Sequence, residues 1–202
     1  GSSSEAMSRI TRALLGLVIV ATLLSPTAVA ARDVPAPVPP DDGELAFVID
    51  VIDGDTIRVD RDGGSSERVR YIGIDTPEIA HQPGETDEPW GPQATDANED
   101  LVGDRLVLLE RDVSETDRYD RLLRYVWVET EDGWVMVNAE LVERGLAEVR
   151  AYEPDTRHHE WFEQLRQEAI EAGEGMYGGL PEAVDDADDD RLETILDFFG
   201  WD

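Results

Sequence analysis

Residues 51–57, VIDGDTI, and residues 70–78, RYIGIDTPE, are the two stretches that decide how this chain folds. Each is rich in β-branched and apolar residues, which predicts a strand, and each contains a turn marked by Gly or Pro. Asp55 lies just past the first turn, and Asp75 lies at the end of the second strand. Two strands of one small barrel can bring these carboxylates together although 20 residues separate them in the sequence.

Further strands and turns extend this pattern in both directions. The predicted strands are residues 45–52, 56–60, 67–74, 105–110 and 122–129. Turns are predicted at residues 62–65 and 132–133, where Gly follows polar residues. Residues 79–91 contain two Pro residues and a Gly before their end, which predicts a long loop.

Helices are predicted at residues 92–102, at residues 137–144, and from a cap at Asp155 or Thr156 as far as Ala172. Gly103 and Gly145 follow the first two helices and are typical stops. The third helix carries apolar residues on one face: Trp161, Phe162, Leu165, Ala169 and Ile170. Five short strands with these helices predict an α+β domain that contains a small β-barrel.

The strongly acidic composition indicates a protein adapted to high salt. The chain of 202 residues has 47 acidic and 17 basic residues, all of the latter Arg, and its net charge is -30. Hydrophobic residues make up 41%, and their periodicity argues against a disordered acidic protein. We expect a haloadapted (halophilic) surface, because carboxylates stay hydrated in molar salt and the short screening length makes their repulsion tolerable. The absence of Cys excludes disulfides, zinc–thiolate sites and a catalytic thiol.

The N-terminal segment, residues 1–31, is expected to be a secretory signal peptide. Arg9 and Arg12 precede an apolar run at residues 13–24, and the small residues 28–30 fit a cleavage site before Ala31. The mature protein is then secreted. The alternative is an uncleaved membrane anchor on the outer face of the cell membrane, since the uncharged stretch is just long enough to span.

Three further segments are predicted from composition. Residues 32–44 form a Pro-rich linker, residues 45–179 form the folded domain, and residues 180–202 form an acidic tail. The tail carries a short amphipathic helix with apolar residues at helical spacing: Leu192, Ile195, Leu196 and Phe199.

The polar residues of the domain favour metal-assisted chemistry on a phosphate. A hard cation such as Ca²⁺ takes six to eight oxygen ligands, which Asp55, Asp75, a backbone carbonyl and water can supply. Glu78 follows a turn fixed by Pro and is placed to accept a proton from water. Arg70 and Arg121 present planar forks that suit two phosphate oxygens. Each of these residues alone is equally consistent with turn chemistry or with ion pairing in an acidic chain.

Taken in order, the motifs carry a specific resemblance. Residues 45–178 resemble the staphylococcal nuclease (thermonuclease) family. The resemblance rests on VIDGDTI at 51–57, RYIGIDTPE at 70–78, WGPQA at 90–94, TDRYDR at 116–121, VNAELV at 137–142 and GLA at 145–147.

The resemblance implies a five-stranded OB-fold β-barrel with three helices, and a Ca²⁺-dependent phosphodiesterase that cleaves DNA and RNA to 3′-phosphate ends. It also implies roles for single residues. Asp55, Asp75 and the Thr76 carbonyl would bind Ca²⁺, Arg70 and Arg121 would grip the phosphate, Glu78 would activate water, and Tyr119 and Tyr152 would lie near the nucleotide.

The chain departs from the family pattern at several positions. Asp120 stands where the family usually has Gly, and it either alters the loop or competes for Arg121. Arg150 replaces one of two aromatic residues on the base side, and the lysines that attract nucleic acid are missing. His158 and His159 are expected at the start of a surface helix, and His81 has no ligand spacing in the sequence.

Two other functions compete with the nuclease interpretation. One is a non-catalytic module of the same fold that binds nucleic acid or protein. The other is a membrane-tethered interaction protein that uses the acidic tail. A non-catalytic module predicts losses among the catalytic positions, whereas the chain retains Asp55, Arg70, Glu78 and Arg121. We expect a monomer that acts on nucleic acid.

Overall fold

The computed structural model describes residues 34–181. The expected signal peptide or anchor at residues 1–31 and the amphipathic helix of the acidic tail lie outside the described residues. Within residues 34–181, no helix is long and apolar enough to cross a membrane.

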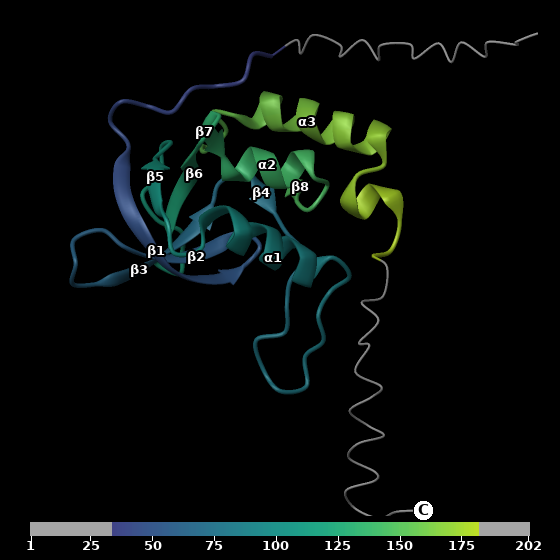
Figure 1. Cartoon of the computed structure of the whole chain (residues 1–202), viewed down its shortest axis with the longest axis horizontal. Coiled ribbons are helices and arrows are strands. Elements are labelled where there is room, and N and C mark those ends of the chain that lie inside the picture. The colour runs from purple at the N-terminus through teal and green to yellow at the C-terminus, as the bar shows by residue number, and fades with distance from the viewer. Residues whose placement is uncertain (1–33, 182–202) are drawn as a thin grey trace, which may run out of the picture. The chain divides into compact units, whose positions relative to one another are not determined.

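A closed barrel forms the centre of the described part of the chain (Figure 1). Its strands are β1 (Glu44–Asp53), β2 (Thr56–Asp60), β3 (Ser66–Tyr71), β5 (Leu106–Glu110) and β6 (Leu122–Thr130). Their order is β3-β2-β1-β5-β6, and a parallel pairing of β3 with β6 closes the barrel. The five-stranded OB-type barrel expected from the sequence is thereby confirmed. A further strand, β7 (Gly133–Met136), forms a hairpin with β6.

The predicted strand at residues 67–74 is wrong at its C-terminal end. β3 stops at Tyr71, and β4 (Ile74–Asp75) pairs instead with β8 (Glu148–Val149) in a separate two-stranded sheet. The break is at Gly73, which has a φ of 81°. Its conformation favours glycine, and a Cβ there would lie 2.9 Å from the ring of Phe162. This break leaves Asp75 at the edge of the barrel.

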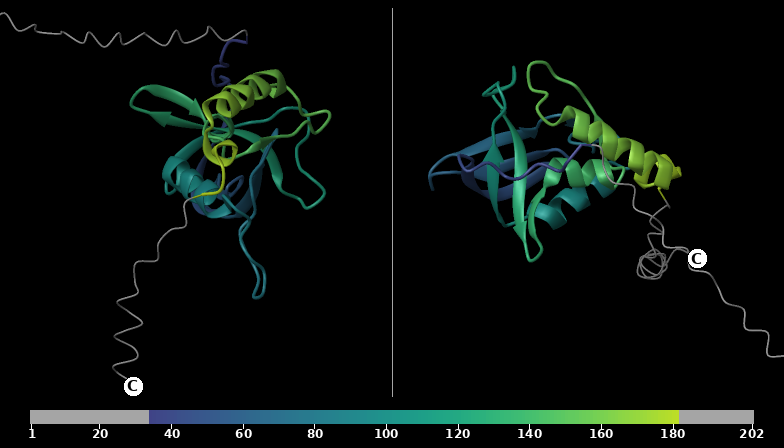
Figure 2. Two further views of the ribbon diagram at one scale, coloured as in Figure 1. Left: turned by 90° about the vertical axis from the view of Figure 1, so that its right-hand side faces the viewer. Right: turned by 90° about the horizontal axis from the view of Figure 1, so that it is seen from above.

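Three α-helices of the described chain gather on one side of the barrel (Figure 2). They are α1 (Gly91–Val102), α2 (Val137–Glu143) and α3 (His159–Ala172), and a short 3₁₀ helix, η1 (Gly175–Gly178), follows. α1 packs on β1, while α2 lies between β6 and α3. The helical positions predicted from the sequence are confirmed for α1 and α2.

The predicted cap of the third helix is wrong. α3 begins at His159, and no side chain caps its first turn. The carboxylate of Asp155 instead accepts hydrogen bonds from the backbone N–H groups of Val113 and Ser114, at 2.9 and 2.7 Å. It therefore fixes the loop between β5 and β6. Ile170, predicted on the buried face, is 40% exposed.

Two buried amides join the helices to the barrel. Asn138 of α2 accepts from the backbone N–H of Val126 and donates to the carbonyl of Ile72, both at 2.9 Å. Asn98 of α1 donates to the carbonyl of Asp53 at 2.9 Å and accepts from the hydroxyl of Tyr71 at 2.8 Å. Because buried polar groups are costly unless paired, these bonds fix the ends of β1 and β3.

Candidate active site

The turn between β1 and β2 delivers Asp55 to the site. Gly54 allows this turn to approach β4 and α1 closely, since a Cβ there would lie 2.7 Å from Thr76 Oγ1 and 2.8 Å from Ala94 Cβ. The Asp55 carboxylate is buried, and its Oδ2 accepts a hydrogen bond of 2.9 Å from the backbone N–H of Thr76. Two distant segments, residues 53–56 and 74–76, are thereby joined.

Arg70 of β3 links the two aspartates of the predicted metal site. Its Nη1 contacts Oδ2 of Asp55, and its Nη2 donates to Oδ1 of Asp75 at 2.6 Å. The Arg70 side chain is 12% exposed and that of Asp55 is 5% exposed. The structure therefore brings together Asp55, Asp75 and Arg70, with Thr76 bonded directly to Asp55.

The oxygens in this group fit a hard divalent cation. Asp55 and Asp75 offer carboxylates, and Thr76 offers a backbone carbonyl in a buried position. Ca²⁺ binds such oxygen donors and takes its remaining ligands from water. The guanidinium of Arg70 shows that a positive charge is accommodated between the two carboxylates.

Asp53, Glu78 and His81 form a second group beside the first. One potential ligand atom from each lies within 4.8 Å of the others, and His81 Nε2 is 3.7 Å from Asp53 Oδ2. Burial raises the pKa of Asp53, although a hydrogen bond from Thr56 and the charge of Arg70 oppose the shift. Burial also raises the pKa of Glu78, and the negative charge of Asp53 adds to this rise.

Sequence reasoning missed the part that Asp53 and His81 play in this group. Asp53 lies within the VIDGDTI motif, where the Gly that follows it indicates only a turn. His81 lies in the loop between β4 and α1, which extends away from the barrel (Figure 1). Only the folded chain brings this loop back to the end of β1. The sequence offered one signal for this group: a Pro follows Thr76, and Glu78 comes directly after it, which places Glu78 close to the site.

Arg121 begins the approach to β6 and is held by Asp117. Its Nε donates to Oδ2 of Asp117 at 2.7 Å, and its backbone N–H donates to Oδ1 at 3.0 Å. Burial opposes ionisation of Asp117, but these bonds outweigh it and lower the pKa of the carboxyl. Asp117, which sequence reasoning missed, is thus the carboxylate paired with Arg121. Asp120 is exposed at the turn, with a φ of 59°.

A cavity of about 500 Å³ lies beside these residues. Its lining includes Arg70, Arg121, Arg118, Tyr119 and Tyr152. Both tyrosines are about half exposed, and the guanidinium carbons of Arg118 and Arg121 lie 4.6 and 5.6 Å from the ring centre of Tyr119. The cavity therefore combines cations with aromatic rings, the combination that binds nucleotides.

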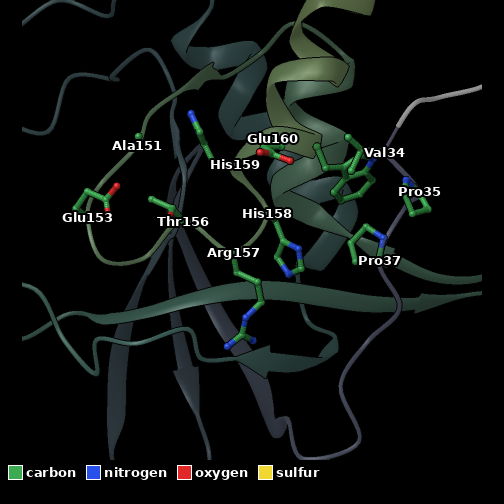
Figure 3. Close-up of a pocket in the computed structure, with 11 residues that line it drawn as sticks. Val34, Pro35, Pro37, Ala151, Glu153, Thr156, Arg157, His158, His159 and Glu160 are labelled. Atoms are coloured by element: carbon green, nitrogen blue, oxygen red, sulfur yellow. The ribbon is translucent and has the colours of Figure 1, made fainter.

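A larger cavity, about 710 Å³, lies elsewhere (Figure 3). It is lined by residues within 34–37, by the segment that precedes α3 and by the first residues of α3. Figure 3 shows His158 near Pro37 and Arg157. Its lining does not overlap with the predicted site residues in the described part of the chain. Volume alone is therefore a poor guide to the chemistry of this molecule.

The expectation of a surface position for His158 is wrong. Its ring packs edge-on against Tyr125, with centres 4.5 Å apart, and its Nε2 lies 3.1 Å from Oε1 of Glu110. Glu110 also accepts from Trp127 and Arg157, each at 2.8 Å. This polar group joins α3 to β5 and β6. It supports the loop at residues 150–157 without touching the proposed metal ligands.

Comparison with known proteins agrees with this arrangement. Residues 68–178 match the family described as staphylococcal nuclease homologue. The chain is 42% identical over 122 residues to the thermonuclease of Staphylococcus hyicus, covering 60% of this chain and 69% of that protein. It is 40% identical over 127 residues to the thermonuclease of Staphylococcus intermedius, covering 63% and 72%.

A relative that is named an endonuclease, rather than a thermonuclease, has a similar level of sequence identity to this chain. Endonuclease YncB of Bacillus subtilis is 39% identical over 120 residues, covering 58% of this chain and 54% of that protein. Together with the barrel, its helices and the cluster at the end of β1, these matches decide the assignment. The chain belongs to the staphylococcal nuclease family and is a hydrolase of the nuclease class.

Proposed function

We propose that this nuclease is a Ca²⁺-dependent phosphodiesterase that hydrolyses DNA and RNA to products with 3′-phosphate ends and works at high salt. One observation carries the proposal: Arg70 contacts both Asp55 and Asp75, and the backbone N–H of Thr76 is bonded to Asp55. Oxygen ligands and a phosphate-binding cation are then available at the same place.

Asp55, Asp75 and the Thr76 carbonyl would hold the cation. A bound divalent cation polarises a phosphoryl oxygen and lowers the pKa of a water molecule. The two carboxylates formally balance the charge of a divalent cation, so that its open coordination positions, rather than a net charge, would receive a phosphate oxygen. Burial of Asp55 and Thr76 lowers the local dielectric, which strengthens each of these interactions.

Glu78 would take the proton of the attacking water. Glu78 lies beside Asp53 and His81, next to the proposed metal ligands, and a carboxylate there can accept a proton. The water oxygen bonds to phosphorus while the bond from phosphorus to the 5′ oxygen breaks. The proton of the water passes to Glu78, and the leaving oxygen takes a proton from solvent. The products are a 3′-phosphate and a 5′-hydroxyl.

Arg70 and Arg121 would stabilise the charge that develops on the phosphate oxygens. Each guanidinium is already oriented, Arg70 by Asp55 and Asp75, and Arg121 by Asp117. Such fixed donors act best on charge that appears only in the transition state, because they need little reorganisation. Tyr119 and Tyr152, at the neighbouring cavity, would contact the nucleotide.

The test uses a fluorescent oligonucleotide digested in molar NaCl with Ca²⁺. The products are then offered to a polymerase before and after treatment with a phosphatase. Ends that extend only after phosphatase treatment carry the expected 3′-phosphate. Products that extend at once would contradict the proposed bond cleavage, and an intact oligonucleotide would favour a non-catalytic binding module.

The salt dependence is proposed from the charge of the chain. Substrate and enzyme repel at long range, since the protein carries a formal charge of -30. The screening length falls from about 10 Å at 0.1 M to about 3 Å at 1 M salt, which suppresses this repulsion more than the short contacts in the site. Both kcat/KM and Tm should therefore rise towards molar salt. A nuclease fastest at low salt, and as stable there, would refute haloadaptation.

Secretion is the proposed location. The basic residues, apolar run and small residues within 1–31 support it. N-terminal sequencing of protein from the culture medium is expected to begin at or near Ala31. Uncleaved protein confined to the membrane fraction would favour the anchor instead.

A further inference from the structure

Arg70 and Arg121 line the cavity, Arg150 lies beside Asp75, and Arg150 is the least constrained of the three arginines. Arg70 is bound to Asp55 and Asp75, and Arg121 is bound to Asp117. The Arg150 side chain is 51% exposed and makes no hydrogen bond within the part of the chain that the structure describes. Its Nε lies 3.7 Å from Oδ2 of Asp75, beyond hydrogen-bond distance.

The backbone fixes the position of Arg150 beside the site. Its N–H donates to the carbonyl of Gly73 at 2.9 Å, and the preceding residue, Val149, pairs with Ile74. The side chain therefore starts from the edge of the β4–β8 sheet, next to Asp75. This anchoring leaves only the flexible guanidinium stem to move.

Arg150 lies outside the set of described residues that line the nucleotide cavity. That set contains Tyr152, two residues further along the chain, together with Arg70 and Arg121. The chain leaving β8 thus places an aromatic ring in the cavity and a guanidinium by Asp75 outside it. Because Asp75 contacts both Arg70 and Arg150, a polynucleotide that has its scissile phosphate at Arg70 would pass close to Arg150.

We propose that Arg150 binds the phosphate next to the scissile phosphate, so that this site recognises at least two successive phosphates of a polynucleotide. The inference rests on the proposed function, because it uses Arg70 and Arg121 as the place of the scissile phosphate. Arg presents five N–H donors in a planar fork that matches two phosphate oxygens. A phosphate supplies the bidentate partner that Asp75, at 3.7 Å, does not.

Charge favours this assignment over a contact with a base. The site holds the carboxylates of Asp53, Asp55, Asp75 and Glu78, which repel a polyanion. Arg121 is paired with Asp117, and Arg70 shares Asp55 and Asp75 with the proposed cation. The guanidinium of Arg150, held only by its 3.7 Å ion pair with Asp75, adds positive charge at the point where the substrate backbone would leave the site.

The experiment uses short single-stranded oligonucleotides in which one phosphate at a time is a neutral methylphosphonate. Binding is followed by fluorescence anisotropy with Ca²⁺ present, on an oligonucleotide whose scissile linkage is itself a methylphosphonate. Wild-type protein is compared with Arg150→Gln and with Arg58→Gln. Arg58 is a matched control, because it is similarly exposed and pairs only with Asp50 on β1 among the described residues.

Neutralising the flanking phosphate should weaken binding to wild-type protein and to Arg58→Gln by about tenfold, typical of one charged hydrogen bond. Arg150→Gln should bind about tenfold more weakly and lose this sensitivity. Its slope of log K against log salt should be shallower by about 0.7, the contribution of one phosphate on a single strand. Arg150→Lys, which keeps the charge without the fork, should retain the slope and part of the affinity.

Equal sensitivity of Arg150→Gln and wild-type protein to every methylphosphonate would overturn the inference. Turnover of an all-phosphate oligonucleotide by Arg150→Gln should show a higher KM with little change in kcat. Loss of Ca²⁺-dependent turnover in wild-type protein would refute the proposed function instead. The anisotropy result stands apart from that failure, because it measures binding to an uncleavable linkage.

Discussion

Nη2 of Arg70 lies 2.6 Å from Oδ1 of Asp75, so the same guanidinium that would grip a phosphate holds a carboxylate that would bind the metal. Asp55 is the third member of this contact. Protein without cation therefore relies on Arg70 to neutralise two carboxylates, one of them buried. Metal binding and phosphate binding are coupled through this one side chain.

Replacing Arg70 by Ala should lower stability most when Ca²⁺ is absent. Removing one partner of a buried ion pair costs about 3–5 kcal/mol, because the other charge is left uncompensated. Ca²⁺ should offset part of this loss by neutralising Asp55 and Asp75. The measurement is denaturant unfolding with chelator and with Ca²⁺, using Arg58→Ala as the control. An equal loss in both conditions would show that Arg70 and the cation do not share these carboxylates.

Replacing Glu78 by Gln or Arg121 by Ala should lower kcat far more than it lowers Tm. A general base supplies about 10²–10⁴-fold and a positioned charge donor about 10²–10³-fold. Glu78 and Arg121 are both outside the hydrophobic core. Single-turnover kinetics together with thermal unfolding separates the two effects. Folded variants with nearly wild-type turnover would refute the catalytic roles.

Replacing Asp120 by Gly should leave the fold intact and raise activity modestly at low salt. Asp120 has a φ of 59°, where Gly is unstrained, and its charge lies next to Arg121 in the chain. Asp120→Ala removes the same charge but keeps the strain, about 1 kcal/mol. Steady-state kinetics and Tm of both variants form a matched pair. If Asp120→Gly unfolds, the side chain has a structural role beyond its charge.

Stability that depends on Glu110 should disappear in acid. Burial raises the pKa of Glu110, but hydrogen bonds from His158, Trp127 and Arg157 outweigh it and lower the pKa overall. A lowered pKa means that the ionised group stabilises the fold above the pKa of the unfolded chain, about 4.3. This stabilisation is lost as the pH falls through the lower pKa of the folded state.

Glu110→Gln should therefore cost about 2 kcal/mol at neutral pH and less as the pH falls below about 4. Urea unfolding at a series of pH values measures the difference from wild-type protein. Glu163→Gln, at an exposed pair with Arg166, serves as the control and should cost less than about 1 kcal/mol. If the difference in unfolding free energy between Glu110→Gln and wild-type protein were unchanged in acid, the charge of Glu110 would contribute nothing to stability.

The barrel is predictable from the sequence because its signals are local. The alternation within residues 56–60, the apolar run within residues 122–129, and turns such as the one at Gly133 depend only on neighbouring residues. The predicted strand at residues 67–74 extends past the end of β3 for a reason that is not local. Gly73 breaks the strand with a positive φ, and Phe162, 89 residues later, leaves no room there for a Cβ; no local pattern reports that contact.

Site residues that belong to a sequence motif were predictable. Site residues whose position depends on a partner far away in the sequence were not. Asp55, Asp75 and Arg70 stand in ordered motifs and do meet. The pairing of Asp117 with Arg121 was missed because Asp120, adjacent to Arg121 in the sequence, is the more obvious partner. His158 was misplaced because the start of an amphipathic helix does not reveal that Glu110, on another element, draws the imidazole inward.

Turnover measured across a Ca²⁺ titration, with chelator and then with Ca²⁺ restored, tests the central claim most directly. In molar NaCl, plasmid cleavage should rise to a plateau with Ca²⁺, stop when excess chelator is added, and return when Ca²⁺ is supplied again. Mg²⁺ should support cleavage poorly, because its tight octahedral shell gives up water reluctantly. Full cleavage in excess chelator would contradict the assignment of Asp55, Asp75 and Thr76 as the ligands of a catalytic cation.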